Sequence, residues 1–428
     1  MQSSTRRDFV RATAAGFAAL AVHSKVLGAN DRINAAIIGV GGRGGWHLQM
    51  LQKHIAAKAD VEIVALCDVY QARLSKAAAK VPGAKTYTHH QELLQRKDID
   101  AVFIATPDHW HAPITLEAME GGKDVYCEKP ITLTVEEAGA VARRAKALGR
   151  IVQVGVQGTS WTRWHKIHEI VQSGQIGQVV ACQGTYSRNN PGGDWNWKID
   201  ADASPDGTGD NHIDWKQWLG PAPQRAFDAD RYFRFRKYWD YSGGIATDLH
   251  YHIVAPFHVA LENDHPTRVA GMGGLWVYND GRETPDTFMT AADYPGKYSM
   301  VVQSSQVNEN GPLMLIRGTK ATIHLGDEWE GPKGRDTETA TIVPETPYRD
   351  EFVKRWGKEE IVIEGVGNEG DLKHFDNFLD CVRSRQQPNC NADLGYKTMT
   401  SIGLSVKSYR EGKMFYFDAK NEKVMDHA

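Results

Sequence analysis

A lysine that follows a short apolar run is the first candidate for acid–base chemistry. Glu128 and Lys129 come directly after the apolar residues 125–127, and a proline follows them. The pKa of a lysine shifts readily with its surroundings, so a lysine beside a carboxylate can be tuned for proton transfer. The structural alternative is a surface ion pair at the end of a strand. The segment lies after a glycine-rich pattern and just before a change in composition, and this context favours a reactive lysine at a domain junction.

Asp248 and His252 form a second candidate pair, because they are four residues apart. If the chain is helical from Thr247 onward, both side chains lie on one face of the helix. A carboxylate and an imidazole in this arrangement can take part in proton transfer. A helix-surface contact without chemistry would show the same spacing. The glycine turn at Gly243 and Gly244, directly before the pair, favours the catalytic interpretation.

A glycine-rich turn near the start of the chain is typical of dinucleotide binding. Gly39, Gly41 and Gly44 satisfy G-x-G-x-x-G between an apolar run at 33–40 and a helical pattern at 46–57. The first glycine permits a tight turn, the second lets backbone N–H groups approach a pyrophosphate, and the third lets the helix pack on the strand. The helix N-terminus would direct its dipole at the phosphates. The residues expected to contact the cofactor here are Gly39, Gly41, Gly42, Arg43 and Gly44.

An acidic residue at the end of the next strand indicates which dinucleotide binds. The apolar run at 61–67 ends on Asp68. Its carboxylate can accept hydrogen bonds from both ribose hydroxyls and would repel a 2′-phosphate. Val69 and Tyr70 follow in place of a basic cluster, so the sequence predicts NAD. Arg73 keeps NADP open as the second choice.

Strands and helices alternate through the first third of the chain, which predicts a doubly wound parallel Rossmann sheet. A buried strand at 100–106 and a helix at 113–120 continue this alternation. Thr134 and Glu137 form a capping box for the next helix. The apolar run at 151–156 is expected to start the second domain.

The composition changes sharply between residues 161 and 239, where seven tryptophans are mixed with polar residues and glycine. Burial in a hydrophobic core would account for some of these tryptophans. The loop at 189–210 is too rich in glycine and polar residues for a core, so Trp195 and Trp197 are candidates for stacking on a sugar or forming a lid. The residues expected to bind substrate are Trp161, Arg163, Tyr238, Trp239, Asp248, His250 and His252.

Short strand patterns in the second half predict an α+β domain with a large open mixed or antiparallel sheet. They lie at 271–277, 298–306 and 313–319. The charged stretch at 327–350 is expected to form a loop or hairpin. Two helices are expected to follow, one from residue 374 and one at 396–409. The expected divisions are a signal segment at 1–31, a nucleotide domain at 32–153, a substrate domain at 154–370 and C-terminal helices at 371–428.

The overall composition describes a soluble chain of about two domains. It has 428 residues, 24% of them charged, and a net charge of −3. No basic patch indicates nucleic acid, and beyond the N-terminus no apolar run reaches the roughly 18 residues of a membrane span. His109 and His111 could suggest a metal, but no third ligand is evident, so we expect none.

Five cysteines have no Cys-x-x-Cys spacing, so they indicate neither a zinc site nor a disulfide framework. Cys67 and Cys127 lie inside apolar strand patterns and are expected to be buried. A bridge between Cys381 and Cys390 would be possible in an oxidising compartment.

The N-terminus has the pattern of an export signal. Residues 5–11 read Thr-Arg-Arg-Asp-Phe-Val-Arg and precede a short, mildly apolar stretch at 12–22. Paired arginines before such a stretch resemble a twin-arginine signal. The alternative is a basic helix start. We expect the twin-arginine translocase to export the folded chain to the periplasm with its cofactor loaded.

The Glu-Lys-Pro run at 128–130, the glycine fingerprint and the Asp-x-x-x-His pattern at 248–252 together resemble the Gfo/Idh/MocA family of sugar-type oxidoreductases. The resemblance implies an NAD(P)-dependent enzyme that acts on a hydroxyl or keto group of a sugar, polyol or glycoside. It implies that Lys129 and His252 carry the proton, that Asp248 assists, and that Glu128 helps to fix the cofactor and the lysine. The turn at 106–111 resembles the family's Thr-Pro-x-x-x-His turn beside the nicotinamide. The further cofactor contacts that the resemblance implies are Thr106, Pro107, His109, His111, Glu128 and Lys129.

Other features of the resemblance concern assembly and the net reaction. It implies C-terminal helices that return to the nucleotide domain and a sheet-mediated homo-oligomer (a dimer or tetramer). Export to a periplasm without a free NAD pool is the reason to expect that NAD stays bound. Some relatives of this fold hydrolyse glycosides by transient oxidation and elimination, which is the alternative function. A sensor without activity is a third. The chain departs from the family pattern at His250, where glycine is frequent, and at Ala255, where aspartate is frequent.

Overall fold

The computed structural model describes residues 32–262, 264–325, 340–363 and 370–427. Residues 33–428 form one compact unit. The expected signal at 1–31 and the first part of the charged stretch at 327–350 lie outside the described residues. None of the helices within the described ranges is long and apolar enough to cross a membrane.

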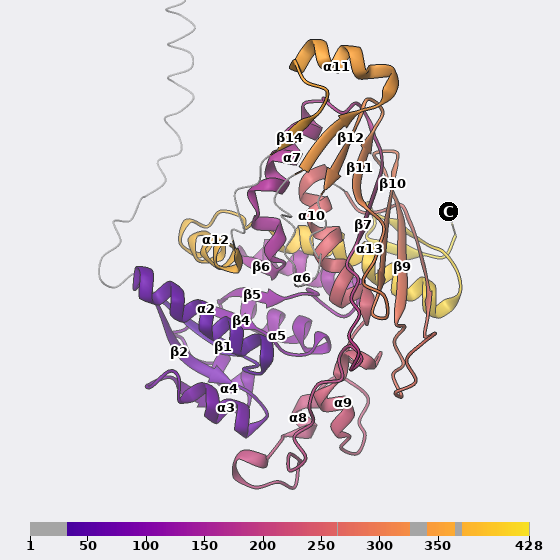
Figure 1. Ribbon diagram of the computed structural model, residues 1–428. Coiled ribbons are helices and arrows are strands. Elements are labelled where there is room, and N and C mark those ends of the chain that lie inside the picture. The colour runs from indigo at the N-terminus through magenta and orange to yellow at the C-terminus, as the bar shows by residue number, and fades with distance from the viewer. Residues whose placement is uncertain (1–31, 263, 326–339, 364–369, 428) are drawn as a thin grey trace, which may run out of the picture. The chain divides into compact units, whose positions relative to one another are not determined.

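The first sheet is parallel and lies at the start of the compact unit. Its elements are β1 (Ile33–Ile38), α2 (Gly42–Lys58), β2 (Val61–Cys67), α3 (Gln71–Ala78), β3 (Lys85–Tyr87), α4 (His90–Leu94), β4 (Ala101–Ile104), α5 (Asp108–Glu120), β5 (Asp124–Glu128), α6 (Val135–Leu148) and β6 (Val152–Gly155). The strand order is β3-β2-β1-β4-β5-β6, with parallel pairing throughout (Figure 1).

Both faces of this sheet are buried, which explains the continuous apolar run of β1. Ala35 and Ile37 belong to the core on the side of α2 and α3, whereas Ala36 and Ile38 belong to the core on the side of α5 and α6. A strand covered on both faces needs apolar residues at every position. The predicted doubly wound sheet is therefore confirmed.

The second sheet is mixed and mostly antiparallel. Its first strand is preceded by η1 (Gln157–Ser160) and α7 (Thr162–Gln172). Between its first and second strands lie η2 (Gly209–Asn211), α8 (Trp215–Leu219), α9 (Ala229–Phe233), η3 (Phe235–Lys237), the π-helical turn η4 (Ala246–His250) and α10 (Tyr251–Leu261). Its strands are β7 (Val179–Thr185), β8 (Arg268–Gly274), β9 (Thr287–Tyr294), β10 (Tyr298–Ser305), β11 (Met314–Gly318), β12 (Ala321–Leu325), β13 (Ala340–Pro344), β14 (Ile361–Ile363), β15 (Phe415–Asp418) and β16 (Lys423–Met425). The remaining elements are η5 (Thr346–Tyr348), α11 (Arg349–Trp356), α12 (Gly370–Ser384) and α13 (Ala392–Glu411).

The ten strands follow the order β14-β13-β12-β11-β7-β10-β9-β8-β15-β16. Strands β7 and β10 pair in parallel, and the other described neighbours pair antiparallel. The expected large open mixed sheet is confirmed. The sequence pattern missed β15 and β16, because residues after α13 were expected to continue the helical return.

Two C-terminal helices pack against earlier elements. From α12, Phe375 lies 5.5 Å from Phe103 of β4 and 4.7 Å from Tyr126 of β5, measured between ring centroids. Helix α13 crosses β8 closely, because a Cβ atom on Gly271 would lie 2.0 Å from the carbonyl oxygen of Ser405. The strands that carry the candidate site are thus held by residues far along the chain.

Several element boundaries differ from those expected. Strand β6 pairs with β5 and completes the parallel sheet, so the run at 151–156 does not start the second domain. Helix α5 begins at Asp108, five residues before the expected start, and contains Pro113 in its interior. Residues 340–344 form β13, which pairs antiparallel with β12 of the second sheet, in the stretch where a loop or hairpin insertion was expected. The capping box of Thr134 and Glu137 is confirmed.

All five cysteines are buried and free. Cys67 and Cys127 lie on β2 and β5, as predicted. Cys381 and Cys390 are not bridged, so this option has no support in the structure.

Candidate active site

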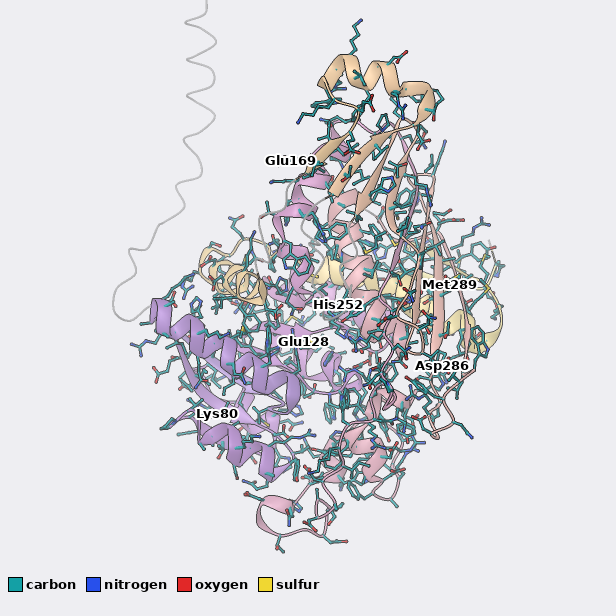
Figure 2. All side chains as sticks on the ribbon, in the orientation of Figure 1. Lys80, Glu128, Glu169, His252, Asp286 and Met289 are labelled. Atoms are coloured by element: carbon teal, nitrogen blue, oxygen red, sulfur yellow. The ribbon has the colours of Figure 1, made fainter. Side chains whose placement is uncertain are left out.

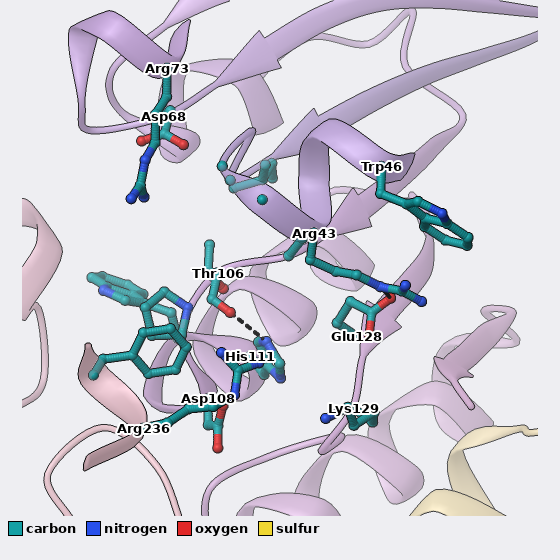
Figure 3. A pocket seen from close by; sticks show the side chains of 18 of the residues that line it. Arg43, Trp46, Asp68, Arg73, Thr106, Asp108, His111, Glu128, Lys129 and Arg236 are labelled. Carbon is teal, nitrogen blue, oxygen red and sulfur yellow. Dashed lines mark hydrogen bonds and ion pairs between the residues drawn. The ribbon is translucent and has the colours of Figure 1, made fainter. Parts of the chain in front are cut away.

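A cavity of about 800 Å³ opens at the carboxyl ends of β1, β2, β4 and β5. This edge of a parallel sheet is where ligands of doubly wound folds bind. Its wall includes Asp68 after β2, Thr106 after β4 and Glu128 at the end of β5, with Arg236 from the second half of the chain (Figure 3). The cavity also includes His252 of α10, whose position relative to Glu128 is visible in Figure 2.

The glycine turn after β1 fits a pyrophosphate. Gly39 has φ +82°, and a Cβ atom there would lie 2.7 Å from the carbonyl oxygen of Ala105. A Cβ atom on Gly44 would lie 1.7 Å from the carbonyl oxygen of Gly39, so only glycine lets α2 begin this close to the strand. Gly39, Gly41 and Gly42 line the cavity, whereas Gly44 lies behind the turn. The turn thereby presents the N-terminus of α2 to an anion.

Asp68 is fixed at the end of β2 by backbone N–H groups of two other residues. Its Oδ2 accepts a hydrogen bond from the Val40 N–H at 2.8 Å, and its Oδ1 accepts one from the Tyr70 N–H at 2.9 Å. Arg73 lies beside it (Figure 3), with its guanidinium carbon 5.2 Å from the Tyr232 ring. The carboxylate is thus held at the place where an adenosine ribose binds in this fold.

We expect Asp68→Asn to raise the use of NADP relative to NAD by about tenfold, equivalent to about 1.4 kcal/mol, because the charge that repels a 2′-phosphate is removed. Arg73 would remain as a cation for that phosphate. The ratio of kcat/KM for the two cofactors is the measurement. The matched control is Asp100→Asn, whose carboxylate accepts a hydrogen bond from the Asn34 N–H at the opposite end of the sheet. An unchanged ratio in Asp68→Asn would contradict the assignment.

Glu128 is the centre of a buried charge cluster. Its Oε1 accepts hydrogen bonds from Arg43 Nε at 2.6 Å and from His47 Nε2 at 2.7 Å. Burial raises the pKa of Glu128, but Arg43 and His47 outweigh it and hold the pKa well below the usual range. Arg43 also lies over the Trp46 ring at 3.9 Å. Glu128 therefore stays ionised and fixes the strand end that precedes Lys129.

His111 joins the turn after β4 to the proline that follows Lys129. Its Nδ1 lies 2.6 Å from the carbonyl oxygen of Pro130, and its Nε2 lies 2.9 Å from that of Thr106 (Figure 3). Carbonyl oxygens only accept, so both hydrogen bonds require a protonated ring. Burial lowers the pKa of His111, but nearby groups, Cys127 and Asp108 among them, outweigh burial and raise it to about 9. This imidazolium therefore links the segment at Thr106 to the segment at Pro130, and both segments border the cavity.

Lys129 and Asp248 meet inside the cavity. Lys129 Nζ donates to Asp248 Oδ1 at 2.5 Å and to the Asp248 carbonyl oxygen at 2.7 Å. Arg236 Nε donates to the same Oδ1 at 2.9 Å, and Trp195 Nε1 donates to Oδ2 at 3.1 Å. Burial raises the pKa of Asp248, but Arg236 and Lys129 outweigh it and hold the pKa well below the usual range. The carboxylate is therefore a fixed anion that positions the ammonium group.

The pKa of Lys129 is lowered, first by burial and then by Arg236, although Asp248 acts in the opposite direction. Burial and the positive charge of Lys129 hold the pKa of His252 well below its usual value. His252 is thus a neutral imidazole at neutral pH, and it lies 5.6 Å from the Tyr186 ring, measured between centroids. The cavity combines an ammonium donor and a neutral base.

A π-helical turn separates the histidines of this segment. Ala246–His250 is π-helical, and α10 begins at Tyr251, whereas a regular helix was expected from Thr247. Asp248 and His252 both line the cavity. His250 instead points to the second sheet, where its Nδ1 lies 3.0 Å from Thr290 Oγ1. Such turns are frequent at functional sites.

The structure does not bring seven of the expected residues to the cavity wall. Those residues are Gly44, His109, Trp161, Arg163, Tyr238, Trp239 and His250. His109 is buried in the first turn of α5, which was not expected to be helical, with its Nε2 3.0 Å from the carbonyl oxygen of Trp218. Tyr238 donates its hydroxyl hydrogen bond to Asp230.

The tryptophans at 161 and 239 have other roles. Trp239 lies 6.2 Å from Tyr409 of α13, between ring centroids. Trp161 packs on the main core at the start of α7, and Arg163 is buried beside Trp164, with its guanidinium carbon 5.2 Å from that ring. These three side chains contact neighbouring parts of the protein instead of the cavity. Residue type alone could not reveal this difference.

The sequence interpretation missed several cavity residues. Trp195 and Trp197 both line the cavity, as their loop suggested. The missed residues include Trp46, Tyr186, Arg188, Lys198, Phe235 and Arg236. Arg188 follows a strand pattern that was not recognised, and Arg236 was part of the segment before the glycine turn without an assigned role. No spacing rule links either arginine to Asp248.

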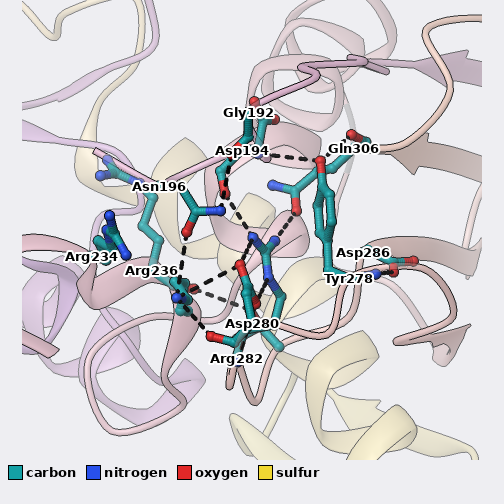
Figure 4. A network of polar contacts seen from close by, with 12 residues as sticks. Gly192, Asp194, Asn196, Arg234, Arg236, Tyr278, Asp280, Arg282, Asp286 and Gln306 are labelled. Carbon is teal, nitrogen blue, oxygen red and sulfur yellow. Dashed lines mark hydrogen bonds and ion pairs between the residues drawn. The ribbon is translucent and has the colours of Figure 1, made fainter. Parts of the chain in front are cut away.

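Arg282 anchors the loop that carries Trp195. It is 4% exposed, and its guanidinium donates to the Asp194 carbonyl oxygen at 2.8 Å, to Gln306 Oε1 at 2.9 Å and to both carboxylate oxygens of Asp280 (Figure 4). The Tyr278 ring lies 4.0 Å below it. The loop is therefore held in place from outside the cavity.

Replacing Arg282 with methionine is expected to raise the KM for substrate by about tenfold and to leave NAD affinity unchanged. The lost hydrogen bonds would release the Asp194 backbone and with it the indole that contacts Asp248. Steady-state kinetics and NAD titration would measure both effects. The control is Arg268→Met, an exposed arginine on β8 that pairs with Asp293. An equal loss of NAD affinity would argue for general unfolding instead.

Within the described ranges, no group of three or more His, Cys, Asp or Glu side chains is arranged to hold a metal ion. The donors of the cavity are directed at each other or at the open space. The glycine turn, Asp68 and the lysine together fit a dinucleotide.

Two family models match the chain. "Oxidoreductase family, NAD-binding Rossmann fold" matches residues 33–156, and "Oxidoreductase family, C-terminal alpha/beta domain" matches residues 161–271. Both models describe Gfo/Idh/MocA proteins, and together they cover more than half of the chain. The protein belongs to the Gfo/Idh/MocA oxidoreductase family, and its first sheet is the NAD-binding Rossmann domain.

Similar solved structures share the fold over nearly the whole chain. A levoglucosan dehydrogenase in complex with NADH and levoglucosan has a TM-score of 0.66 at 16% identity, covering 92% of this chain and 99% of its own. An aldose-aldose oxidoreductase from Caulobacter crescentus has a TM-score of 0.65 at 17% identity, covering 90% and 100%.

A curated relative is similar over a shorter segment. A "Glycosyl hydrolase family 109 protein" from Shewanella sp. (strain W3-18-1) is 38% identical over 125 residues, which is 27% of this chain. The match spans only about a quarter, 26%, of that relative's length.

Proposed function

We propose that the protein transfers a hydride between NAD and a CH–OH group of a sugar, polyol or glycoside. The observation that carries this proposal is the contact of Lys129 with Asp248, beside His252, in the same cavity as the glycine turn and Asp68. Acid–base groups and a dinucleotide turn in one cavity are what hydride transfer to or from an alcohol requires.

Bound NAD supplies the carbon that accepts or returns the hydride. In the oxidation direction, the C–H electron pair leaves as hydride, the hydroxyl proton passes to a base, and a carbonyl group forms. His252 is neutral and accepts that proton. Lys129 uses two of its three N–H groups on Asp248, so the third is free to donate to the substrate oxygen. Arg236 and Trp195 keep the Asp248 carboxylate in place during the step.

The lowered pKa values give this mechanism a pH signature. Protonation of His252 removes the base, so kcat/KM for oxidation falls on the acid side with an apparent pKa below 6.5. Loss of the Lys129 proton removes the donor, so kcat/KM also falls on the alkaline side, with an apparent pKa below 10.5. An acid limb with a pKa above 6.5 would contradict the assignment of His252.

Aromatic side chains on the opposite wall support a sugar as substrate. Trp197 is 45% exposed and lines the cavity together with Tyr186 and Phe235. Flat apolar faces bordered by charged groups suit a sugar ring, which has apolar C–H faces and polar edges. The names of the two structural neighbours, one with levoglucosan and one acting on aldoses, point to the same class.

The decisive experiment uses protein purified with its nucleotide. The nucleotide is released from one sample and identified, while a second sample is mixed with sugars, polyols and glycosides. Reduction of NAD by one of them, with release of the oxidised product, is expected. Failure of every compound to reduce the bound NAD would refute the proposal.

A second candidate is an NAD-dependent glycosidase that works by transient oxidation and elimination. The observation in its favour is the partial match to family 109 glycosyl hydrolases. This reaction releases a free sugar from a glycoside and returns the nicotinamide to its starting state. Free sugar without lasting NAD reduction would therefore select this candidate over the dehydrogenase.

We further propose that the chain is exported by the twin-arginine translocase and works in the periplasm with NAD tightly bound. The support is the paired arginines at positions 6 and 7 and the fit of the cavity to a dinucleotide. Cell fractionation that finds the mature chain only in the cytoplasm would refute this.

We also propose a homo-oligomer, a dimer or tetramer, built on the second sheet, where Met272 and Val362 are exposed. Light scattering that finds a monomer would refute it.

A further inference from the structure

Arg236 is a rigid cation on the substrate side of the cavity. Its Nε is fixed by Asp248 Oδ1 at 2.9 Å. Its guanidinium carbon lies 4.7 Å from the Phe235 ring and 5.3 Å from the Trp197 ring. Among the residues that the structure describes, none offers an acceptor to its two terminal nitrogens. A guanidinium held in this way presents two parallel N–H donors, the geometry that recognises a carboxylate.

Arg188 is fixed in a similar manner after β7. One of its terminal nitrogens donates to the Tyr186 hydroxyl at 2.8 Å, and the guanidinium carbon lies 4.7 Å from the same ring. Its other terminal nitrogen lies 3.9 Å from Asp194 Oδ2. Both arginines line the cavity and are positioned by aromatic rings, so little entropy is lost when they bind a ligand.

The charges on this side of the cavity do not balance. Three cations act on the single carboxylate of Asp248 and lower its pKa, namely Arg236, Lys129 and Arg188. Lys198 also lines the cavity, and no carboxylate of the described ranges lies within ion-pair distance of it. The other carboxylates here are Asp194 and Asp108, which accepts a hydrogen bond from Thr247 Oγ1. With the His111 imidazolium included, five cations lie near three carboxylates, so positive charge is in excess on this side of the cavity.

We propose that the substrate is an acidic sugar, a carbohydrate whose carboxylate binds Arg236 and Lys198 while its CH–OH group faces Lys129 and His252. This inference rests on the proposed function and names its substrate class. A carboxylate offsets part of this excess positive charge and fills the two donors of Arg236. A neutral sugar offers no charge to Arg236 and Lys198, so these side chains would lose water on binding without gaining an ion pair. A phosphate carries the same chemistry with more charge, so the experiment separates the two.

The test compares matched sugars on the NAD-loaded enzyme. The pairs are glucose with glucuronate and galactose with galacturonate, and glucose 6-phosphate is the phosphate probe. Reduction of NAD gives kcat and KM, and titration calorimetry gives binding independently of turnover. We expect the uronates to bind at least about tenfold more tightly than their neutral partners, equivalent to about 1.4 kcal/mol. Higher salt should reduce this preference, since charged contacts are screened.

Two lysine variants locate the anion site. Lys198→Met is expected to reduce the preference for uronate severalfold, because it removes a cation from the cavity wall. Lys216→Met is the matched control, since Lys216 is an exposed lysine of α8 that does not line the cavity. An equal loss of preference in both variants would overturn the assignment of Lys198.

The possible results separate this inference from the function on which it rests. Equal affinity for uronates and neutral sugars, with NAD reduced by both, overturns the acidic substrate and leaves the dehydrogenase. Tight uronate binding without any NAD reduction overturns the dehydrogenase and supports the anion site. Stronger binding of glucose 6-phosphate than of glucuronate overturns the carboxylate. If no sugar binds and none reduces NAD, both proposals fail.

Discussion

Replacing Lys129 with methionine is expected to lower kcat for sugar oxidation by about 10² to 10⁴, the range typical for a missing acid–base group. Lys129 Nζ is the ammonium group that Asp248 holds from two oxygens in the cavity. Methionine keeps an unbranched side chain as far as Cε and removes the donor. NAD binding should persist, because the glycine turn and Asp68 are unchanged. Stopped-flow reduction of bound NAD measures the chemical step directly.

A second buried lysine controls for the loss of charge in the protein interior. Lys123 is 1% exposed, and its Nζ donates to the Arg96 carbonyl oxygen at 2.6 Å, outside the cavity wall. Lys123→Met should lower stability and leave kcat near the wild-type value. If Lys129→Met retained wild-type kcat, the proposed mechanism would be wrong.

Replacing Glu128 with alanine is expected to lower the free energy of unfolding by about 3 kcal/mol. Removal of one partner from a buried ion pair typically costs about 3–5 kcal/mol, because the other charge stays buried and unpaired. The Arg43 side chain is 35% exposed, which places the expected cost at the lower end, while His47 is fully buried. Denaturant unfolding is the measurement. Glu120→Ala is the control, because its ion pair with Arg144 is exposed and should contribute less than about 1 kcal/mol.

The same carboxylate predicts a pH dependence of stability. The folded pKa of Glu128 lies below the ordinary value of about 4.3, so its contribution is fully present above that value. The contribution is lost as the pH falls toward the folded pKa. The difference in stability between wild type and Glu128→Ala should therefore shrink in acid. A difference that stays constant down to the folded pKa would show that the charge of Glu128 is not responsible.

Much of the first sheet follows from local sequence rules. The run at 61–67 forms β2 with the predicted bounds, and the Thr134 box caps α6. Gly39 and Gly44 lie where only glycine fits, so the G-x-G-x-x-G pattern follows from close backbone contacts at these positions. Such features depend on neighbours in the sequence, and they are therefore readable without the structure.

The substrate side of the site depends on contacts that the sequence does not encode locally. A π-helical turn directs His250 to the second sheet while Asp248 and His252 face the cavity, and a regular helix was the only expectation available. Arg188 and Arg236 both lower the pKa of the Asp248 carboxyl, from segments almost fifty residues apart. Trp239 was expected to bind substrate and instead lies near Tyr409 of α13. Residue type alone could not separate these cases.

Hydride transfer between sugar and NAD can be followed with deuterium. The NAD-loaded enzyme is mixed with a substrate sugar that carries deuterium on the carbon of its reacting CH–OH group, and the nucleotide is then analysed by mass spectrometry. We expect one deuterium on the nicotinamide, with the oxidised sugar released and the transfer nearly abolished in Lys129→Met. Sugar turnover with no deuterium on the nucleotide would contradict this expectation.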